Sequence, residues 1–150
     1  MRVAIGADHA GYELKERVKR LLEARGHEVR DMGTTSTEST DYPIYAFRVA
    51  EAVRDAAADR GVLICSTGNG IAIAANKVEG VRAAICANAG QAELSRRHND
   101  ANVLVLGSSC VAVSDLEPTV DAWLSAPFDG GRHARRVGLI TEYERTHTRR

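Results

Sequence analysis

The chain has 150 residues, with 20 Lys and Arg against 20 Asp and Glu, so its formal net charge is zero. This length is sufficient for one domain with a sizeable core and too short for two full domains, so we expect a single domain spanning residues 1–150. Balanced charge provides no broad positive field, which argues against nucleic acid or an anionic membrane as a partner. Any phosphate chemistry must therefore depend on locally placed charges.

The first residues and the cysteines bear on location. The chain opens on a strand-like apolar segment, residues 2–6, rather than on a basic and then apolar leader. No apolar run approaches the roughly 20 residues needed to cross a bilayer. Cys65, Cys86 and Cys110 are odd in number and scattered, which argues against a disulfide framework and a zinc site. We expect a soluble cytoplasmic protein with reduced thiols.

Short apolar runs alternate with amphipathic stretches along the chain, and this rhythm predicts βαβ units around a parallel sheet. The later runs are apolar without alternation, as expected when helices cover both faces of such a sheet. The fold class is therefore α/β. The predicted strands are residues 3–6, 27–32, 62–65, 83–87 and 102–107.

Helical periodicity separates these strands. The first predicted helix has Leu14, Val18, Leu21 and Leu22 at positions i, i+4, i+7 and i+8, and Gly26 follows as a stop. After a polar segment, residues 33–40, that is either a substrate-facing lid or a solvated connector, Asp41 can cap the second helix. That helix is entered through Tyr42 and Pro43, and its predicted apolar face comprises Tyr45, Val49, Ala52 and Val53. Later helices are predicted to start near Asn69, Gly90, Ser114 and Arg132.

Polar residues follow the ends of the first and third predicted strands, the edge where open parallel sheets bind ligands. Asp8 and His9 follow the first strand, and Cys65 ends the third. Asp8 could merely cap the next helix, whereas His9 adds a titratable group at the same edge. An isolated cysteine is more often an inert buried thiol. The partial positive charge of a helix N-terminus, however, favours the thiolate, the form that a general base needs.

The glycine loop after Cys65 does not match the common nucleotide-binding motifs. Its third position in the dinucleotide fingerprint is Ile73 rather than glycine, and no Lys-Ser or Lys-Thr pair follows to make a P-loop. A cysteine-phosphatase loop would have an arginine where this chain has Ile71. The backbone amides from Ser66 to Ile71 can still hold an anion or stabilise an oxyanion that forms during a reaction.

Two later segments carry further candidates. Arg132, Arg135 and Arg136 crowd the start of the last predicted helix, the end at which cations are unfavourable. An anionic ligand held by Arg132 and Arg136, which share a helical face, would explain this placement, and a solvated basic face is the alternative. His98 and Asn99 close an earlier helix, where a histidine is also favoured simply by the helix dipole.

The segments GADHAG, DYP, CSTGNGIAIAANK, RRHNDANVLVLG and GGRHARRV occur in the same order and spacing as in sugar-phosphate isomerases of the ribose-5-phosphate isomerase B type. The resemblance covers nearly the whole chain. It implies a Rossmann-like three-layer α/β/α sandwich with a five-stranded parallel sheet, and homodimers or homotetramers whose active sites lie between subunits. It also implies interconversion of aldose and ketose phosphates without a metal or a cofactor.

The resemblance further implies residue roles. Cys65 is similar to the base that moves a proton between the first two sugar carbons, with Thr67 beside it, and His98 resembles the histidine that assists opening of the furanose ring. The phosphate ligands would include His9, and the amides of residues 68–70 would form the anion hole for an enediolate. The implied substrate-binding residues are Asp8, His9, Tyr42, Ser66, Gly68, Asn69, Gly70, Ile71, Asn99, Arg132 and Arg136.

Two positions depart from the family pattern. Some relatives have glycine in place of Ser66, and many have a phosphate-binding arginine in place of Ser109. Because other relatives use a glutamate where this chain has Ile71, the chain resembles the cysteine-base type.

The predicted reaction interconverts ribose 5-phosphate and ribulose 5-phosphate through an enediolate. Ser109 leaves open the same chemistry on a tetrose 4-phosphate, such as erythrose or erythrulose 4-phosphate, or on a hexose 6-phosphate. A non-catalytic module that senses a sugar phosphate or nucleotide is the alternative from another class. Cys65, Thr67 and His98 argue against it, because a sensor needs affinity but no base.

Overall fold

The computed structural model describes residues 1–148. The strands are β1 (Arg2–Ala7), β2 (Glu28–Asp31), β3 (Arg60–Cys65), β4 (Ala83–Ile85) and β5 (Val103–Gly107). The helices are the 3-10 helix η1 (His9–Gly11) and the α-helices α1 (Tyr12–Ala24), α2 (Tyr42–Arg54), α3 (Asn69–Ala75), α4 (Ala89–Asn99), α5 (Val113–Ser125) and α6 (Arg132–His147). Each predicted strand and helix is confirmed, with boundaries that shift by a few residues. Within the described residues, no helix has the length and apolar character that a membrane span requires.

The strands form one five-stranded sheet in the order β2-β1-β3-β5-β4, and every neighbouring pair is parallel. The chain leaves β1 towards one edge of the sheet to form β2 and then crosses to the other side of β1 to form β3. This reversal places a topological switch point between the carboxyl ends of β1 and β3, the position where open α/β sheets bind ligands. Asp8 and Cys65 lie at these two ends.

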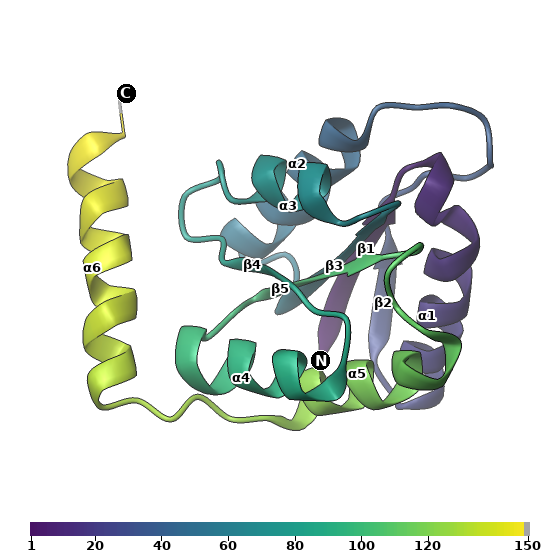
Figure 1. Ribbon diagram of the computed structural model, residues 1–150. Coiled ribbons are helices and arrows are strands. Elements are labelled where there is room, and N and C mark those ends of the chain that lie inside the picture. Colours follow the sequence, from purple (N-terminus) through teal and green to yellow (C-terminus); the bar gives the residue numbers. More distant parts are fainter. Residues whose placement is uncertain (149–150) are drawn as a thin grey trace.

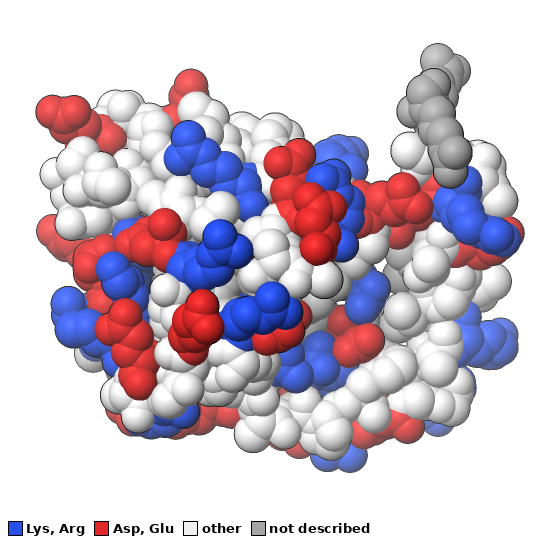
Figure 2. Space-filling model, turned by 180° about the vertical axis from the view of Figure 1, so that it is seen from behind, with Lys and Arg blue, Asp and Glu red and all other residues white. Residues whose placement is uncertain are grey.

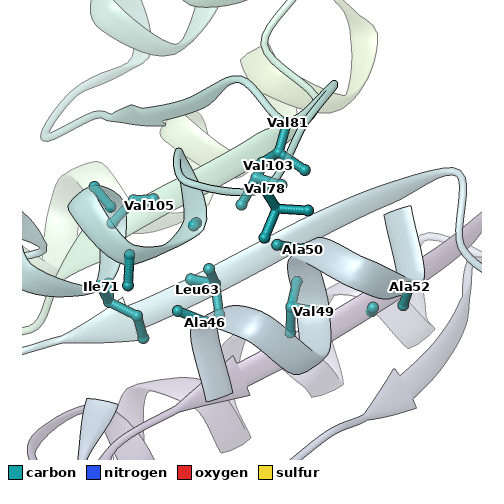
Figure 3. Packing of buried hydrophobic residues seen from close by; sticks show 14 of the residues in the cluster. Ala46, Val49, Ala50, Ala52, Leu63, Ile71, Val78, Val81, Val103 and Val105 are labelled. Atoms are coloured by element: carbon teal, nitrogen blue, oxygen red, sulfur yellow. The ribbon is translucent and has the colours of Figure 1, made fainter. Parts of the chain in front are cut away.

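Helices cover both faces of the sheet, which gives the predicted three-layer α/β/α sandwich (Figure 1). On one face, α2 and α3 enclose a core that includes Val49, Leu63, Ile71 and Val105, all fully buried (Figure 3). On the other face, α1, α4 and α5 pack around a second core that contains the fully buried Trp123. The non-alternating strands are explained by this double coverage.

The second helix differs from its prediction in two respects. Ala46 and Ala50 are fully buried and belong to its sheet-facing surface, although the predicted apolar face omitted them. Asp41 occupies the N-cap position with extended backbone, but its side chain makes no capping hydrogen bond, so the predicted cap is wrong in this detail. Pro43 in the first turn supplies the preset backbone angle that starts the helix.

The last helix, α6, stands apart from the sandwich and is joined to it by an extended connection (Figure 1). Among the described residues of α6, His133 is the buried one, whereas Leu139, Ile140 and Tyr143 are each more than half exposed. A helix that leaves so much apolar surface in solvent lacks a covering partner within its own chain. On the face seen in Figure 2, acidic and basic side chains are interspersed rather than segregated.

Candidate active site

Hydrogen bonds join the loops that follow β1, β3 and β5. The Asp8 amide donates to the Ile64 carbonyl at 3.3 Å, and the Ser108 amide donates to the Cys65 carbonyl at 2.8 Å. The Ser108 hydroxyl also donates to the Ala10 carbonyl at 3.0 Å. The polar residues that the sequence places after three separate strands therefore form one contiguous surface around Cys65.

Cys65 lies at the base of this surface with only 5% of its area exposed. Its sulfur accepts a hydrogen bond from the Gly68 amide at 3.1 Å. Gly68 holds the left-handed backbone conformation, with φ of +86°, that turns the chain from β3 into α3 and aims this amide back at the sulfur. Glycine adopts that conformation without the steric penalty that a Cβ would cause. The thiol is thus placed at the beginning of a helix with an amide hydrogen directed at it.

The first turn of α3 presents the amides of residues 68–71, which have no carbonyl acceptor within the helix because of their position. The Gly68 amide donates to the Cys65 sulfur, and the Asn69 amide donates to the Thr67 hydroxyl oxygen at 3.2 Å. The amides of Gly70 and Ile71 are the other two of this turn and are the candidates for holding an oxyanion. Thr67 therefore shapes the loop through its side chain and is itself exposed beside Cys65.

Tyr42 lies over the same loop although it comes from the start of α2. A Cβ at Gly70 would lie 2.5 Å from Cζ of the Tyr42 ring, well inside contact distance. Glycine at position 70 is thus required for the ring to approach the backbone, which is a reason for this glycine independent of any nucleotide motif. The structure brings Tyr42 and the loop together and leaves Tyr42 40% exposed.

The Asp8 side chain caps the 3-10 helix η1, in agreement with the prediction that Asp8 could cap the helix that follows β1. Oδ1 accepts hydrogen bonds from the amides of Ala10 and Gly11 at 3.0 and 3.1 Å, and the residue is buried. Both bonds end on Oδ1, so Oδ2 is the oxygen that a ligand hydroxyl would meet.

His9 is held by the segment that precedes α2. Its Nδ1 lies 3.1 Å from the Thr40 amide nitrogen and 3.2 Å from the Thr40 carbonyl oxygen. Both contacts of Nδ1 are with Thr40, so Nε2 is the ring nitrogen that remains to meet a ligand. Thr40 is the last residue of the polar segment 33–40, which was predicted as a lid or a connector. The end of this segment therefore contacts His9, a candidate site residue.

Ser66 and Ser109 join the β3 and β5 loops. The Ser109 hydroxyl donates to the Ser66 carbonyl at 2.6 Å, and the Ser109 amide donates to the same oxygen at 3.0 Å. The two hydroxyl oxygens are 3.4 Å apart. Ser109 thus places a short side chain, bonded to the Cys65 loop, at this point of the surface.

The remaining predicted site residues lie at the opposite end of the strands, the amino end. Helix α4 starts beside the carboxyl end of β4 and runs back, so His98 and Asn99 lie near the amino ends of the strands. The Arg82 guanidinium, just before β4, donates to the Asn99 carbonyl at 3.1 Å. The separation along β3 from Gly61 to Cys65 is about 13 Å at ~3.3 Å per residue. One chain therefore does not bring His98 and Asn99 to Cys65.

Arg132 and Arg136 accompany His98 rather than Cys65. The imidazole rings of His98 and His133 are stacked with centroids 4.1 Å apart and planes 6° from parallel, which fixes the start of α6 against the end of α4. Arg132 directly precedes His133 in α6, and Arg136 follows three residues later. The fourteen predicted site residues thus fall into two groups. The His98 group, at the amino ends of the strands, comprises His98, Asn99, Arg132 and Arg136. The others form the Cys65 group at the carboxyl ends.

His133 is a functional candidate that the sequence did not reveal. Burial lowers the pKa of His133, and the neighbouring His98, Arg132 and Arg136 lower it further, whereas Asp129 opposes the shift. The available signal was a histidine next to Arg132 in a helix start already crowded with cations. Nothing in the linear sequence shows that this ring would meet His98, 35 positions earlier.

Comparison with known proteins gives a consistent result. Residues 3–140 match the family described as Ribose/Galactose Isomerase. Ribose-5-phosphate isomerase B of Escherichia coli is 51% identical over 143 residues, which cover 95% of this chain and 96% of the relative. A structure of ribose-5-phosphate isomerase B from Clostridium thermocellum superimposes with a TM-score of 0.97 at 52% identity, covering 99% of this chain and 100% of the other. A Mycoplasma genitalium ribose-5-phosphate isomerase B with bound ribulose-5-phosphate gives a TM-score of 0.92 at 42% identity, covering 98% and 97%.

The fold and the matched sequence are those of an aldose-ketose isomerase that acts on sugar phosphates. The chain belongs to the ribose/galactose isomerase family and is of the ribose-5-phosphate isomerase B type, as the resemblance of its segments implied.

Proposed function

We propose that this enzyme interconverts ribose 5-phosphate and ribulose 5-phosphate through an enediolate, with Cys65 as the base. The observation that carries the proposal is the placement of the Cys65 sulfur beside the first-turn amides of α3, at the topological switch point of the sheet. The ribulose 5-phosphate bound by the Mycoplasma genitalium relative supports a five-carbon substrate.

The reaction transfers a proton between two adjacent carbons. A thiolate at Cys65 would remove the proton from C2 of the open-chain aldose, and negative charge would develop on O1. The amides of Gly70 and Ile71 would stabilise that charge, and one such preorganised donor is worth about 3 to 4 kcal/mol. Transfer of the O2 hydroxyl proton to O1 and return of the proton from Cys65 to C1 would give the ketose. A positioned base contributes a further ~100- to 10,000-fold.

The other residues would hold the substrate by its two ends. Nε2 of His9, together with Arg132 and Arg136, would bind the phosphate dianion. Oδ2 of Asp8, the Tyr42 hydroxyl and Asn99 would contact the sugar hydroxyls. Charge-assisted contacts at the phosphate fix the reacting carbons relative to the base. No step in this scheme requires a metal or a cofactor.

Within one chain, His98 and Cys65 lie at opposite ends of the parallel strands. We therefore propose that each active site is shared between two subunits of a homodimer or homotetramer. An open groove of about 710 Å³ runs between α3 and β4, beginning at Asn69 beside the Cys65 loop and including the exposed side chains of Ile73 and Ile85. This apolar groove and the exposed apolar side of α6 are surfaces that a second copy would cover. His98, Asn99, Arg132 and Arg136 of that copy would then complete the site.

The same chemistry on a tetrose 4-phosphate or a hexose 6-phosphate is the alternative, because Ser109 offers no positive charge to a phosphate. Purified protein should be assayed against four-, five- and six-carbon aldose and ketose phosphates, with and without chelator. We expect the highest kcat/KM on the five-carbon pair and no effect of the chelator. Preference for a tetrose or hexose phosphate would overturn the substrate assignment, and loss of activity with chelator would overturn the metal-free mechanism.

The cytoplasm is the proposed site of action, because Cys65, Cys86 and Cys110 are all free thiols, and a reducing compartment maintains them. Oxidation of Cys65 would remove the base.

A further inference from the structure

His133 and His98 form a stacked pair at the junction of α4 and α6. Their rings are nearly parallel at 4.1 Å, and His133 is 9% exposed, whereas His98 is more open to solvent. The connection between the helices is also fixed: the Asp129 amide donates to the Arg97 carbonyl at 3.0 Å, and the two side chains form an ion pair at 3.2 Å. The ring plane of His98 is therefore determined by a neighbour that is itself held in place.

The donor atoms of His98, Asp129 and His133 all lie within 4.8 Å of one another, a spacing that could hold a metal ion. The surrounding charge disfavours that use. Arg97 pairs with the Asp129 carboxylate, and Arg132 and Arg136 act on His133 from its own helix. One carboxylate, already paired with Arg97, and two further guanidinium groups near His133 make the cluster unfavourable for a divalent cation, so the imidazole pair is better suited to handling a proton.

Two imidazoles at this distance do not readily carry two positive charges. Burial and the arginines of α6 favour the neutral state of His133, and Asp129 only partly opposes them. His98 is the ring of the pair that is more open to solvent.

We propose that His133 is a positioning residue for ring opening: its stacked imidazole holds the His98 ring in one orientation towards the substrate. This inference depends on the proposed function of His98. Opening of a furanose breaks the bond between C1 and the ring oxygen, places a proton from His98 on that oxygen, and releases the C1 hydroxyl proton to solvent. His98 is then reprotonated from solvent, so the step involves no net change in protons.

Two substrates separate positioning from a general structural role. Ribose 5-phosphate is a furanose and must be opened, whereas ribulose 5-phosphate cannot close a five-membered ring because its O5 is esterified. We expect His133→Ala to lower kcat, measured at saturating ribose 5-phosphate, by about 10- to 100-fold, as misplacement of a catalytic group does. The kcat at saturating ribulose 5-phosphate should change by only a few-fold. His133→Phe, which restores a planar ring, should recover most of the lost rate.

His147→Ala is the matched control, because it removes another stacked imidazole from α6, the one 4.1 Å from the Tyr143 ring. It should leave both rates unchanged. Equal losses with the two substrates in His133→Ala, or no loss with either, would overturn the proposal, as would failure of His133→Phe to recover activity when circular dichroism and oligomeric state match the wild type.

Imidazole NMR tests the same contact without turnover. The His98 ring signal should shift and broaden in His133→Ala and return in His133→Phe, and an unchanged signal in His133→Ala would refute positioning. If the wild-type protein isomerises no sugar phosphate, the proposed function fails while this spectroscopic result still decides whether His133 orders His98.

Discussion

The thiol of Cys65 and the imidazole of His98 lie at opposite ends of the strands of one parallel sheet. Cys65 ends β3, whereas His98 closes α4, which runs antiparallel to the strands. Both residues lie in segments that resemble sugar-phosphate isomerases of the ribose-5-phosphate isomerase B type. With the roles proposed above, a single chain would hold two incomplete half-sites, and assembly of subunits would combine them.

Mixing of inactive variants tests this arrangement. Cys65→Ala and His98→Ala homo-oligomers should each be impaired, but subunit exchange between them should restore activity. A two-fold symmetric dimer with shared sites would regain about a quarter of wild-type turnover, because half of the molecules are mixed and each has one intact site. Activity of the mixture on ribose 5-phosphate, compared with that of each variant alone, provides the measurement. A mixture no more active than its components would place the whole site within one chain.

Replacement of the proposed base should separate chemistry from binding. Cys65→Ala is expected to lower kcat by about 100- to 10,000-fold, the contribution of a positioned base, while substrate affinity measured by calorimetry stays within a few-fold. Cys110→Ala is the matched control, since that thiol is exposed and free. Turnover retained by Cys65→Ala would exclude the cysteine as the base.

The arginines at the start of α6 should differ in their effects. Arg132→Ala is expected to raise KM by about 10- to 100-fold with a smaller change in kcat, since a charge-assisted phosphate contact is worth ~1.5 to 3 kcal/mol in both ground and transition states. Arg135→Ala, one residue before Arg136 on another side of the same helix, should leave KM near the wild-type value. Equal effects of the two substitutions would indicate a diffuse basic surface.

Contact between Gly70 and Tyr42 predicts a steric effect. Gly70→Ala places a methyl group 2.5 Å from Tyr42 Cζ, so the ring must move. We expect a loss of about 1 to 3 kcal/mol in the free energy of unfolding together with a raised KM. Removal of the ring in the double variant Gly70→Ala/Tyr42→Ala should relieve the stability loss relative to Gly70→Ala alone. Gly138→Ala, where a Cβ meets nothing within 4 Å, is the control.

A buried ion pair away from the site should make stability depend on pH. Lys15 is 1% exposed, and its ammonium lies 2.6 Å from Oδ2 of Asp31. Burial alone would raise the pKa of Asp31, but hydrogen bonds from Lys15 and from the Gly33 amide outweigh it and hold the pKa below its usual value. A carboxylate whose pKa is lowered by folding stabilises the fold above its unfolded pKa, and this contribution is lost as pH falls.

Asp31→Asn should therefore destabilise the protein by about 2 to 3 kcal/mol at neutral pH, because it leaves the buried ammonium short of a partner. The difference from wild type should shrink below about pH 4, near the unfolded pKa of an aspartate. Urea unfolding at several pH values measures both. Asp55→Asn, in an exposed pair with Arg54, should behave like the wild type. A constant difference across the pH range would contradict the assignment.

Much of the molecule could be predicted from the sequence because the relevant signals are local. The alternation of strands and helices, the double-sided burial of β3 and β5, and the first turn after Cys65 are consequences of short-range apolar patterns and glycine placement. The family pattern then identified the same residues by their order along the chain.

Distances between segments were decided only by the tertiary structure. Neither the stacking of His133 on His98 nor the contact between Tyr42 and Gly70 has a counterpart in any local pattern, because each joins elements separated by many residues. The separation of Cys65 from His98 follows from the direction in which α4 crosses the sheet. Sequence spacing carries no information on direction in space. Cys65 and His98 belong to the same set of sequence motifs, but the pairing of the parallel strands places them at opposite ends of the sheet's strands.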